Sequence, residues 1–219
     1  MSFVWLSHVL TNDTPLYGGA DNLNIMADKS INAGDSCNTS FIKMPSHAGT
    51  HVDAPRHFFS KGRSIDSFSA HEWIFHNSCL IEIDVQPGTL IEPENISKYN
   101  ISEQSDFIIF KTGFEHWRED DIFWQQSPGL APELAKFLLL KCPNLRAVGM
   151  DFISISSLKH REEGRMAHRE FLQRDIIIFE DMRLSELQPH VQLQKVIALP
   201  LRFKQGDGAP CTIVGEVVG

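Results

Sequence analysis

The segment 46–58, SHAGTHVDAPRHF, constrains this chain more than any other stretch. Four of its polar residues, His47, His51, Asp53 and His57, occupy odd positions, so an extended backbone would turn them toward one face. A helix would leave the aspartate on another side, and the glycine, β-branched residues and proline of the segment disfavour a helix. Imidazole nitrogen and carboxylate oxygen suit zinc or manganese. The spacing therefore predicts an extended segment that presents a divalent-metal site with a spare acid–base group.

A histidine-rich loop that binds no ion is the alternative interpretation of any one of these histidines. The segment resembles the HxGTHxDxPxH signature of the metal-dependent cyclase-like hydrolases, a family that includes bacterial kynurenine formamidase and isatin hydrolase. Every fixed position of that signature is present. The resemblance implies that His47, His51 and Asp53 bind metal. It implies that His57 instead donates and accepts protons during catalysis.

Two residues of the second half of the chain, His168 and Glu180, lie in a helical stretch and at the end of a β-branched run. Such a histidine and such an acid are, by themselves, more often structural than functional. Cyclase-like hydrolases show a similar pattern, an alanine–histidine pair followed by a glutamate, which Ala167, His168 and Glu180 match in residue and spacing. The resemblance implies that His168 binds a second ion and that Glu180 bridges both ions or binds the first. His160 competes with His168, but position 172, at the matching interval from His160, is leucine.

Two other stretches bear on substrate choice. In TPLYGG, composition alone favours Tyr17 as a packed residue of an ordinary turn. Family members carry an aromatic residue in a similar turn, so the resemblance makes Tyr17 a candidate substrate-binding residue. Asp151 ends a short strand pattern, at the edge where α/β sheets bind ligands. The loop that includes it, GMDFISIS, departs from the GIDTPSID pattern of similar proteins, so its contribution to substrate choice is left open.

Hydrophobic periodicity predicts an α/β fold with a mixed sheet. The order strand, helix, strand between 106 and 151 is typical of a parallel βαβ unit. The family resemblance implies a swivelling β/β/α domain whose barrel-like central sheet holds the site. No Pro-, Gly- or Ser-rich linker divides the chain, so we expect a single domain over 1–219. The predicted strands are 3–9, 41–44, 79–85, 106–112, 147–151 and 175–179, the predicted helices are 127–142 and 164–174, and a closing hairpin lies within 195–218.

Composition excludes several classes of partner. The formal net charge is −8, the pI is near 5.6 and the basic residues are scattered, which offers no basic surface for nucleic acid or an anionic membrane. The cysteines are widely spaced without a CxxC pair, as expected of reduced thiols. No cleavable leader or bilayer-length apolar run is recognisable. We therefore expect a cytoplasmic protein that acts on a small molecule.

These features predict a metal-dependent hydrolase that cleaves an arylformamide such as N-formylkynurenine, or a related lactam or ester, with one or two zinc or manganese ions per subunit. The alternative is a metal-containing module that binds a small ligand without turnover. His57 favours the enzyme, because a histidine that is not a ligand has little purpose in a closed structural site. A serine or cysteine nucleophile is disfavoured, since no GxSxG elbow is present. The resemblance also implies a homo-oligomer, a dimer or higher.

Overall fold

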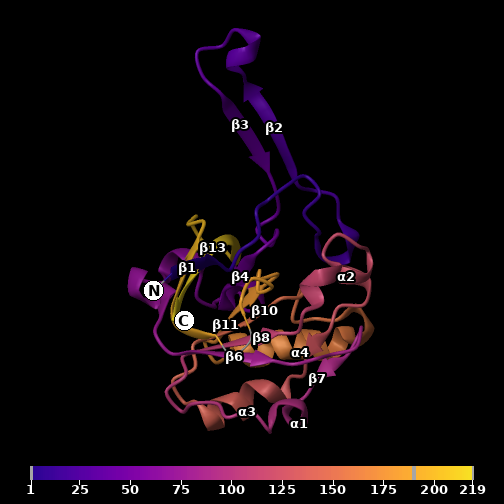
Figure 1. The fold of residues 1–219 in the computed structure, drawn as a ribbon, viewed down its shortest axis with the longest axis vertical. Helices are drawn as coiled ribbons and strands as arrows, with labels where there is room; N and C mark the ends of the chain where they lie inside the picture. Colours follow the sequence, from indigo (N-terminus) through magenta and orange to yellow (C-terminus); the bar gives the residue numbers. More distant parts are fainter. Residues whose placement is uncertain (1, 189–190, 219) are drawn as a thin grey trace.

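The computed structural model describes residues 2–188 and 191–218. Within these ranges, nine strands form one mixed sheet, and two shorter pairs of strands lie outside it (Figure 1). The strands of the main sheet are β1 (Ser2–Trp5), β4 (His51–Asp53), β5 (Ile74–Phe75), β6 (Ser78–Glu82), β8 (Phe107–Lys111), β10 (Ala147–Met150), β11 (Ile177–Glu180), β12 (Gln192–Pro200) and β13 (Gly208–Val218). Their order is β5–β12–β13–β4–β11–β10–β8–β6, with β1 paired to β13.

The remaining elements are short. The two outer strand pairs are β2 (Asn24–Lys29) with β3 (Thr39–Lys43) and β7 (Leu90–Ile91) with β9 (Gly129–Leu130). The α-helices of the described residues are α1 (Pro93–Ile96), α2 (Ile122–Gln125), α3 (Glu133–Lys141) and α4 (Arg161–Leu172). In Figure 1, α1 and α3 lie at the end of the molecule opposite the β2–β3 hairpin.

One half of the main sheet is parallel. Strands β6, β8, β10 and β11 run in the same direction, and α3 and α4 connect β8 to β10 and β10 to β11. The predicted βαβ unit is therefore confirmed. Its helix starts at Glu133 rather than at Ser127, because Gly129 and Leu130 form β9 instead, and Pro132 then precedes the first helical residue.

Strand β4 joins this parallel half to an antiparallel half. It runs antiparallel to both β11 and β13, and β13 in turn pairs with β12 and β1. Strand β12 also lies against β6, so the sheet curls until its two ends nearly meet. The chain thus has the expected α/β fold with a mixed, barrel-like central sheet.

Strand β8 shows why this fold is stable for this sequence. Its apolar residues are fully buried and alternate between the two faces of the sheet. Ile108 and Phe110 pack with residues of α3 and α4, whereas Phe107 and Ile109 pack inside the curled sheet with residues of β4 and β13. Burial on both faces is what the continuous apolar run at 106–112 predicts.

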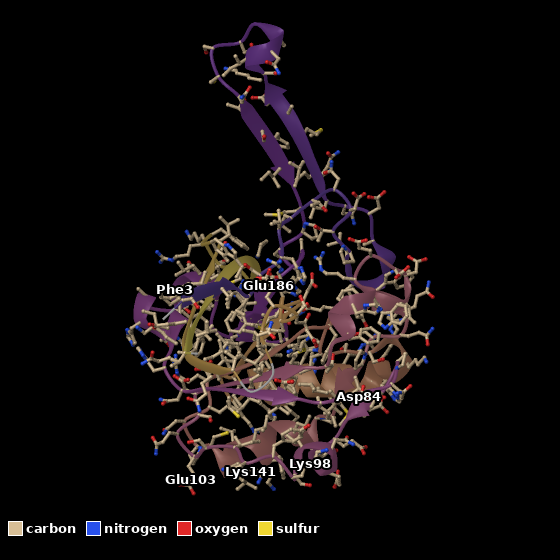
Figure 2. All side chains as sticks on the ribbon, in the orientation of Figure 1. Phe3, Asp84, Lys98, Glu103, Lys141 and Glu186 are labelled. Carbon is tan, nitrogen blue, oxygen red and sulfur yellow. The ribbon has the colours of Figure 1, made fainter. Side chains whose placement is uncertain are left out.

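The β2–β3 hairpin is the part of the molecule that differs most from this core. It projects from the body as a two-stranded arm whose side chains point into solvent (Figures 1 and 2). Met26, Phe41 and Ile42 are exposed on it. The sequence predicts a strand at 41–44 but not its partner β2, and association between copies of the chain stays a prediction. None of the helices in the described residues is long and apolar enough to cross a bilayer.

Candidate metal centre

The signature segment is not one extended strand, so the expectation that a shared face aligns its four polar residues is wrong. Only His51–Asp53 is extended, as β4, while His57 lies on a 3-10 turn over Pro55–His57. His47 precedes a turn in which Gly49 has a φ of 60°, a left-handed conformation that favours glycine. The proline and this glycine bend the chain at both ends of β4. The four residues nevertheless come together. Ligand atoms of His47 and His57 both lie close to those of Asp53, and so do those of His51.

Strand β4 places two of these residues beside Glu180. The sheet register pairs His51 with Glu180 on β11, and alternation puts Asp53 on the same face as His51. Val52 points the other way and is fully buried in the core between β4, β11 and β13. Packing of Val52 therefore holds the two polar neighbours toward the site.

Two carboxylates and two imidazoles form the buried part of the cluster. His51 Nε2 lies 3.5 Å from Asp53 Oδ1 and 3.3 Å from Glu180 Oε2. His168 Nε2, from α4, lies 3.4 Å from Asp53 Oδ2 and 3.6 Å from Glu180 Oε1. Each carboxylate therefore lies between the same two rings.

The other ring nitrogen of each buried histidine is fixed by the backbone. His51 Nδ1 lies 2.7 Å from the Gly49 carbonyl oxygen, and His168 Nδ1 lies 2.8 Å from the Gly164 carbonyl oxygen. A carbonyl oxygen can only accept, so both Nδ1 atoms carry hydrogen and donate it. Both Nε2 atoms consequently face the carboxylates. A histidine that binds a metal through one ring nitrogen typically donates a hydrogen bond from the other, as both Nδ1 atoms do here.

The loop after β10 holds Glu180 in place. Ser154 Oγ and the Ile155 backbone N–H donate hydrogen bonds of 3.0 and 2.7 Å to Glu180 Oε1. Ser156 Oγ lies 3.3 Å from His168 Nδ1. The divergent GMDFISIS loop, whose role the sequence leaves open, thus supports the glutamate and histidine that complete the cluster.

A more open part of the cluster contains a residue that the sequence analysis missed. Asp207, from the turn between β12 and β13, has Oδ2 at 2.9 Å from His47 Nε2 and 3.4 Å from His57 Nδ1. His47 Nδ1 lies 2.7 Å from Asp53 Oδ1. A side chain at Gly208 would collide with the His47 ring, so this glycine allows the turn to approach. The available signal was an acid between two glycines in QGDGAP.

The positive and negative charges of the cluster compensate one another. Burial lowers the pKa of His168, but hydrogen bonds to Asp53 and Glu180 outweigh it and raise the pKa to about 10. The pKa of His47 rises to about 9, because Asp53 and Asp207 outweigh the effect of burial. For Glu180, the contacts with His168 and His51 overcome burial and the charge of Asp53, and the pKa falls to about 2. Without an ion, two buried carboxylates are therefore neutralised by imidazolium groups.

These residues fit a divalent cation. Asp53 and Glu180 are 1% and 4% exposed, and among the described residues imidazoles are their only ion-pair partners. Two groups of ligand atoms lie close enough to share an ion: those of His47, Asp53 and His57, and those of His51, Asp53 and Glu180. A cation at such a position replaces imidazole protons and satisfies Nε2 atoms and carboxylate oxygens together. The ligand roles themselves stay predictions.

The cluster forms the floor of a cavity of about 310 Å³. Its lining includes the apolar or aromatic side chains of Tyr17, Phe58 and Ile153, and the Phe58 ring stacks on His168 with centroids 4.6 Å apart. Arg161 and Arg165 of α4 also line the cavity. Tyr17 thus lies where a substrate-binding residue is expected, although no contact with a substrate tests that role.

Two sequence candidates lie elsewhere. His160 Nε2 lies 3.1 Å from the Gly88 carbonyl oxygen and does not line the cavity, which supports the preference for His168. Asp151 directly follows the last residue of β10, but it is fully buried away from this cavity and accepts hydrogen bonds from Thr112 and Gly113. Burial raises the pKa of Asp151 to about 7 despite these bonds. Asp151 therefore fixes a turn and does not line the cavity of the metal centre.

The chain is similar to known proteins in sequence and in fold. The sequence profile of the family described as "Putative cyclase" matches residues 4–157. The chain is 27% identical over 205 residues to the kynurenine formamidase of Bacillus cytotoxicus, covering 94% of this chain and 92% of that protein. It is 26% identical over 216 residues to cyclase-like protein 2 of Oryza sativa subsp. japonica, covering 94% and 75%.

The fold is also similar to a crystal structure of an isatin hydrolase bound to the product analogue thioisatinate. The TM-score is 0.82 at 19% identity, and the superposition covers 99% of this chain and 92% of the other. This likeness concerns the fold, whereas the profile match covers most of the sequence, from residue 4 to residue 157. The chain therefore belongs to the putative cyclase family.

Proposed function

We propose that the protein is a metal-dependent hydrolase that cleaves an arylformamide such as N-formylkynurenine, or a related lactam or ester. The observation that carries this proposal is the convergence of the His51 and His168 Nε2 atoms on the buried carboxylates of Asp53 and Glu180, at the floor of a cavity. The similarity to kynurenine formamidases over nearly the full chain supports the choice of an amide bond.

We assign one zinc or manganese ion to His47, His51 and Asp53. A second ion would be held by His168, with Glu180 shared between the two. Asp53 and Glu180 lie between the imidazoles of His51 and His168, which supports the proposal that both carboxylates would help to hold the ions. When bound, such an ion polarises the scissile carbonyl and lowers the pKa of water from 15.7 to about 7.

His57 handles the proton in this proposal. Its Nδ1 faces Asp207, which leaves Nε2 available to the substrate if Nδ1 carries the hydrogen. Burial lowers the pKa of His57, so near pH 7 the ring is uncharged and can accept a proton. It accepts a proton from the attacking water and returns one to the leaving amine nitrogen. Asp207 orients the ring for both transfers.

The test is hydrolysis of N-formylkynurenine by zinc- or manganese-loaded protein, by chelator-stripped protein and by stripped protein that is reloaded. Turnover that disappears with the ion and returns with it is the expected result. Metal binding without turnover on arylformamides, lactams or esters would contradict the enzyme and favour the ligand-binding module. Failure to bind either ion would contradict the metal centre itself.

A further inference from the structure

One face of α4 lines the cavity from its floor to its rim. Arg161, Arg165 and His168 follow one another at spacings of four and three residues, so they share a helix face. All three line the cavity. His168 is buried in the metal centre, whereas both arginines are exposed. The helix therefore places two positive charges between solvent and the ligand cluster.

Neither arginine forms a buried ion pair with a carboxylate of the described residues. Among the residues that the structure describes, Arg161 forms no ion pair with a carboxylate. Arg165 pairs with Glu162 at 2.7 Å, but the two side chains are 59% and 78% exposed. Solvent screens such a pair, which contributes little to stability. Both guanidinium groups are thus available to an anion that enters the cavity.

The negative charges lining the cavity are, by contrast, already matched. Asp181 accepts two hydrogen bonds from Arg118, at 2.8 and 2.7 Å. Asp53 and Glu180 contact imidazoles in the ligand cluster. A ligand carboxylate near Arg161 and Arg165 consequently meets two guanidinium groups, of which only Arg165 has a carboxylate partner among the described residues, the solvent-exposed Glu162.

The apolar lining residues determine what else such a ligand carries. Tyr17, Phe58 and Ile153 line the same cavity and offer surfaces suited to a flat ring. Burial raises the pKa of Tyr17, and the nearby Arg161 guanidinium partly offsets that rise, so phenol and arginine are close neighbours. Arginine binds carboxylates through paired hydrogen bonds of fixed geometry.

We propose that Arg161 and Arg165 bind a carboxylate of the substrate, remote from the bond that is cleaved, and thereby select aryl amides that carry a carboxylate over those that lack one. This inference rests on the proposed hydrolysis. The inference favours N-formylkynurenine over a simple lactam such as isatin, because the first carries such a carboxylate and the second does not. The two arginines are specificity-determining residues and take no part in proton transfer.

The test compares N-formylkynurenine with its carboxamide, which lacks the negative charge, using metal-loaded protein. We expect the wild type to prefer the carboxylate by about tenfold or more in kcat/KM, the value of a charge-assisted hydrogen bond. In the Arg161→Met/Arg165→Met double variant, the preference should fall to about one, mainly through KM. Arg161→Lys/Arg165→Lys should retain part of it. Circular dichroism and metal content check that the variants are folded and loaded.

Arg174→Met is the matched control. It removes one positive charge just beyond the end of α4, where Arg174 pairs with Glu170 away from the cavity. This variant should keep the wild-type preference. An unchanged preference in the double variant, with both substrates hydrolysed, would overturn the inference and leave the proposed function intact.

Calorimetry separates the inference from the proposed function. Kynurenine, the expected product, should bind the wild type at least about tenfold more tightly than it binds the double variant. Its carboxamide should lose little affinity on the same substitution. Equal binding of kynurenine to both proteins would overturn the inference even if hydrolysis is observed. A difference in binding without hydrolysis would support the anion site and contradict the enzyme.

Discussion

The candidate centre has a buried half and an open half, and they differ in what holds them. His51, Asp53, His168 and Glu180 are at most 5% exposed and come from β4, α4 and β11. The side chains of His47, His57 and Asp207 are 23%, 30% and 41% exposed and come from turns. Groups that keep a fixed geometry around an ion belong on rigid elements, whereas groups that meet water and substrate belong at the surface. His47 is the exception, since it lies in the open half but is assigned to the first ion. The comparison predicts separate effects for the two halves.

The largest effect is expected in the buried half. His51→Ala should abolish metal binding and reduce turnover by about a thousandfold or more, since loss of the ion removes several kcal/mol of carbonyl polarisation. Metal content by atomic absorption and kcat/KM are the measurements. His71→Ala, at an exposed histidine that contacts Ser69 away from the cavity, is the control. A full complement of metal in His51→Ala would remove this residue from the ligand set.

A large effect of a different kind is expected in the open half. His57→Ala should keep its metal but lose about 10²- to 10⁴-fold in kcat, the range for a general acid–base group. Metal content and steady-state kinetics on the same sample distinguish this outcome from loss of the ion. If His57→Ala instead lost metal in parallel with activity, His57 would be a ligand, as its proximity to His47 and Asp53 allows.

Asp207→Asn should have an intermediate effect. Loss of the carboxylate that orients His57 should reduce kcat/KM by about 10- to 100-fold while metal stays bound. A negative charge beside an imidazole raises its pKa, so its removal should move the acid limb of the pH–rate profile toward lower pH. An unchanged limb would show that Asp207 does not act through His57.

The smallest effect is expected at Ser154, whose hydroxyl donates a hydrogen bond to Glu180 of the buried half. Ser154→Ala removes one hydrogen bond to Glu180 but leaves the bond from the Ile155 N–H. Metal affinity should weaken by about tenfold or less, with little change in kcat for fully loaded protein. Titration of stripped protein with zinc measures this, and Ser97→Ala, at a serine that bonds the Glu94 carbonyl far from the site, is the control. A loss as large as that of His51→Ala would mean that the loop, and not the sheet, fixes the centre.

Sequence reasoning singled out His51 and Asp53 from a local pattern, whereas His168 and Glu180 were singled out by the family resemblance. Alternation brings His51 and Asp53 to one face, and a strand that ends at Glu180 follows a helix that carries His168. The fold was predictable for the same reason, since the apolar run of β8 and the helix–strand order after it are local signals. The start of α3 was misplaced, because the pairing of β9 with β7 competes with helix formation.

The open half was harder to predict, because its geometry depends on contacts distant in sequence. The odd spacing placed His47 and His57 on one face of a single extended segment, but a left-handed glycine and a proline turn determine their positions. Asp207 reaches the site only through the pairing of β13 with β4. The partner strand β2 was also missed, since it pairs with β3 alone and shows no clear alternation of buried and exposed residues.

The position of β4 between β11 and β13 affects how the protein is made. Its register pairs Asp53 with Ile178 on one side and with Gly208 on the other, so both partners of this early strand come late in the chain. During synthesis from the N-terminus, the signature segment therefore emerges long before it can take its final hydrogen bonds. A translation product that stops before residue 208 contains every residue of the signature, yet one edge of β4 has no partner. Such a product contains the signature but lacks β13, which pairs with β4 in the folded protein.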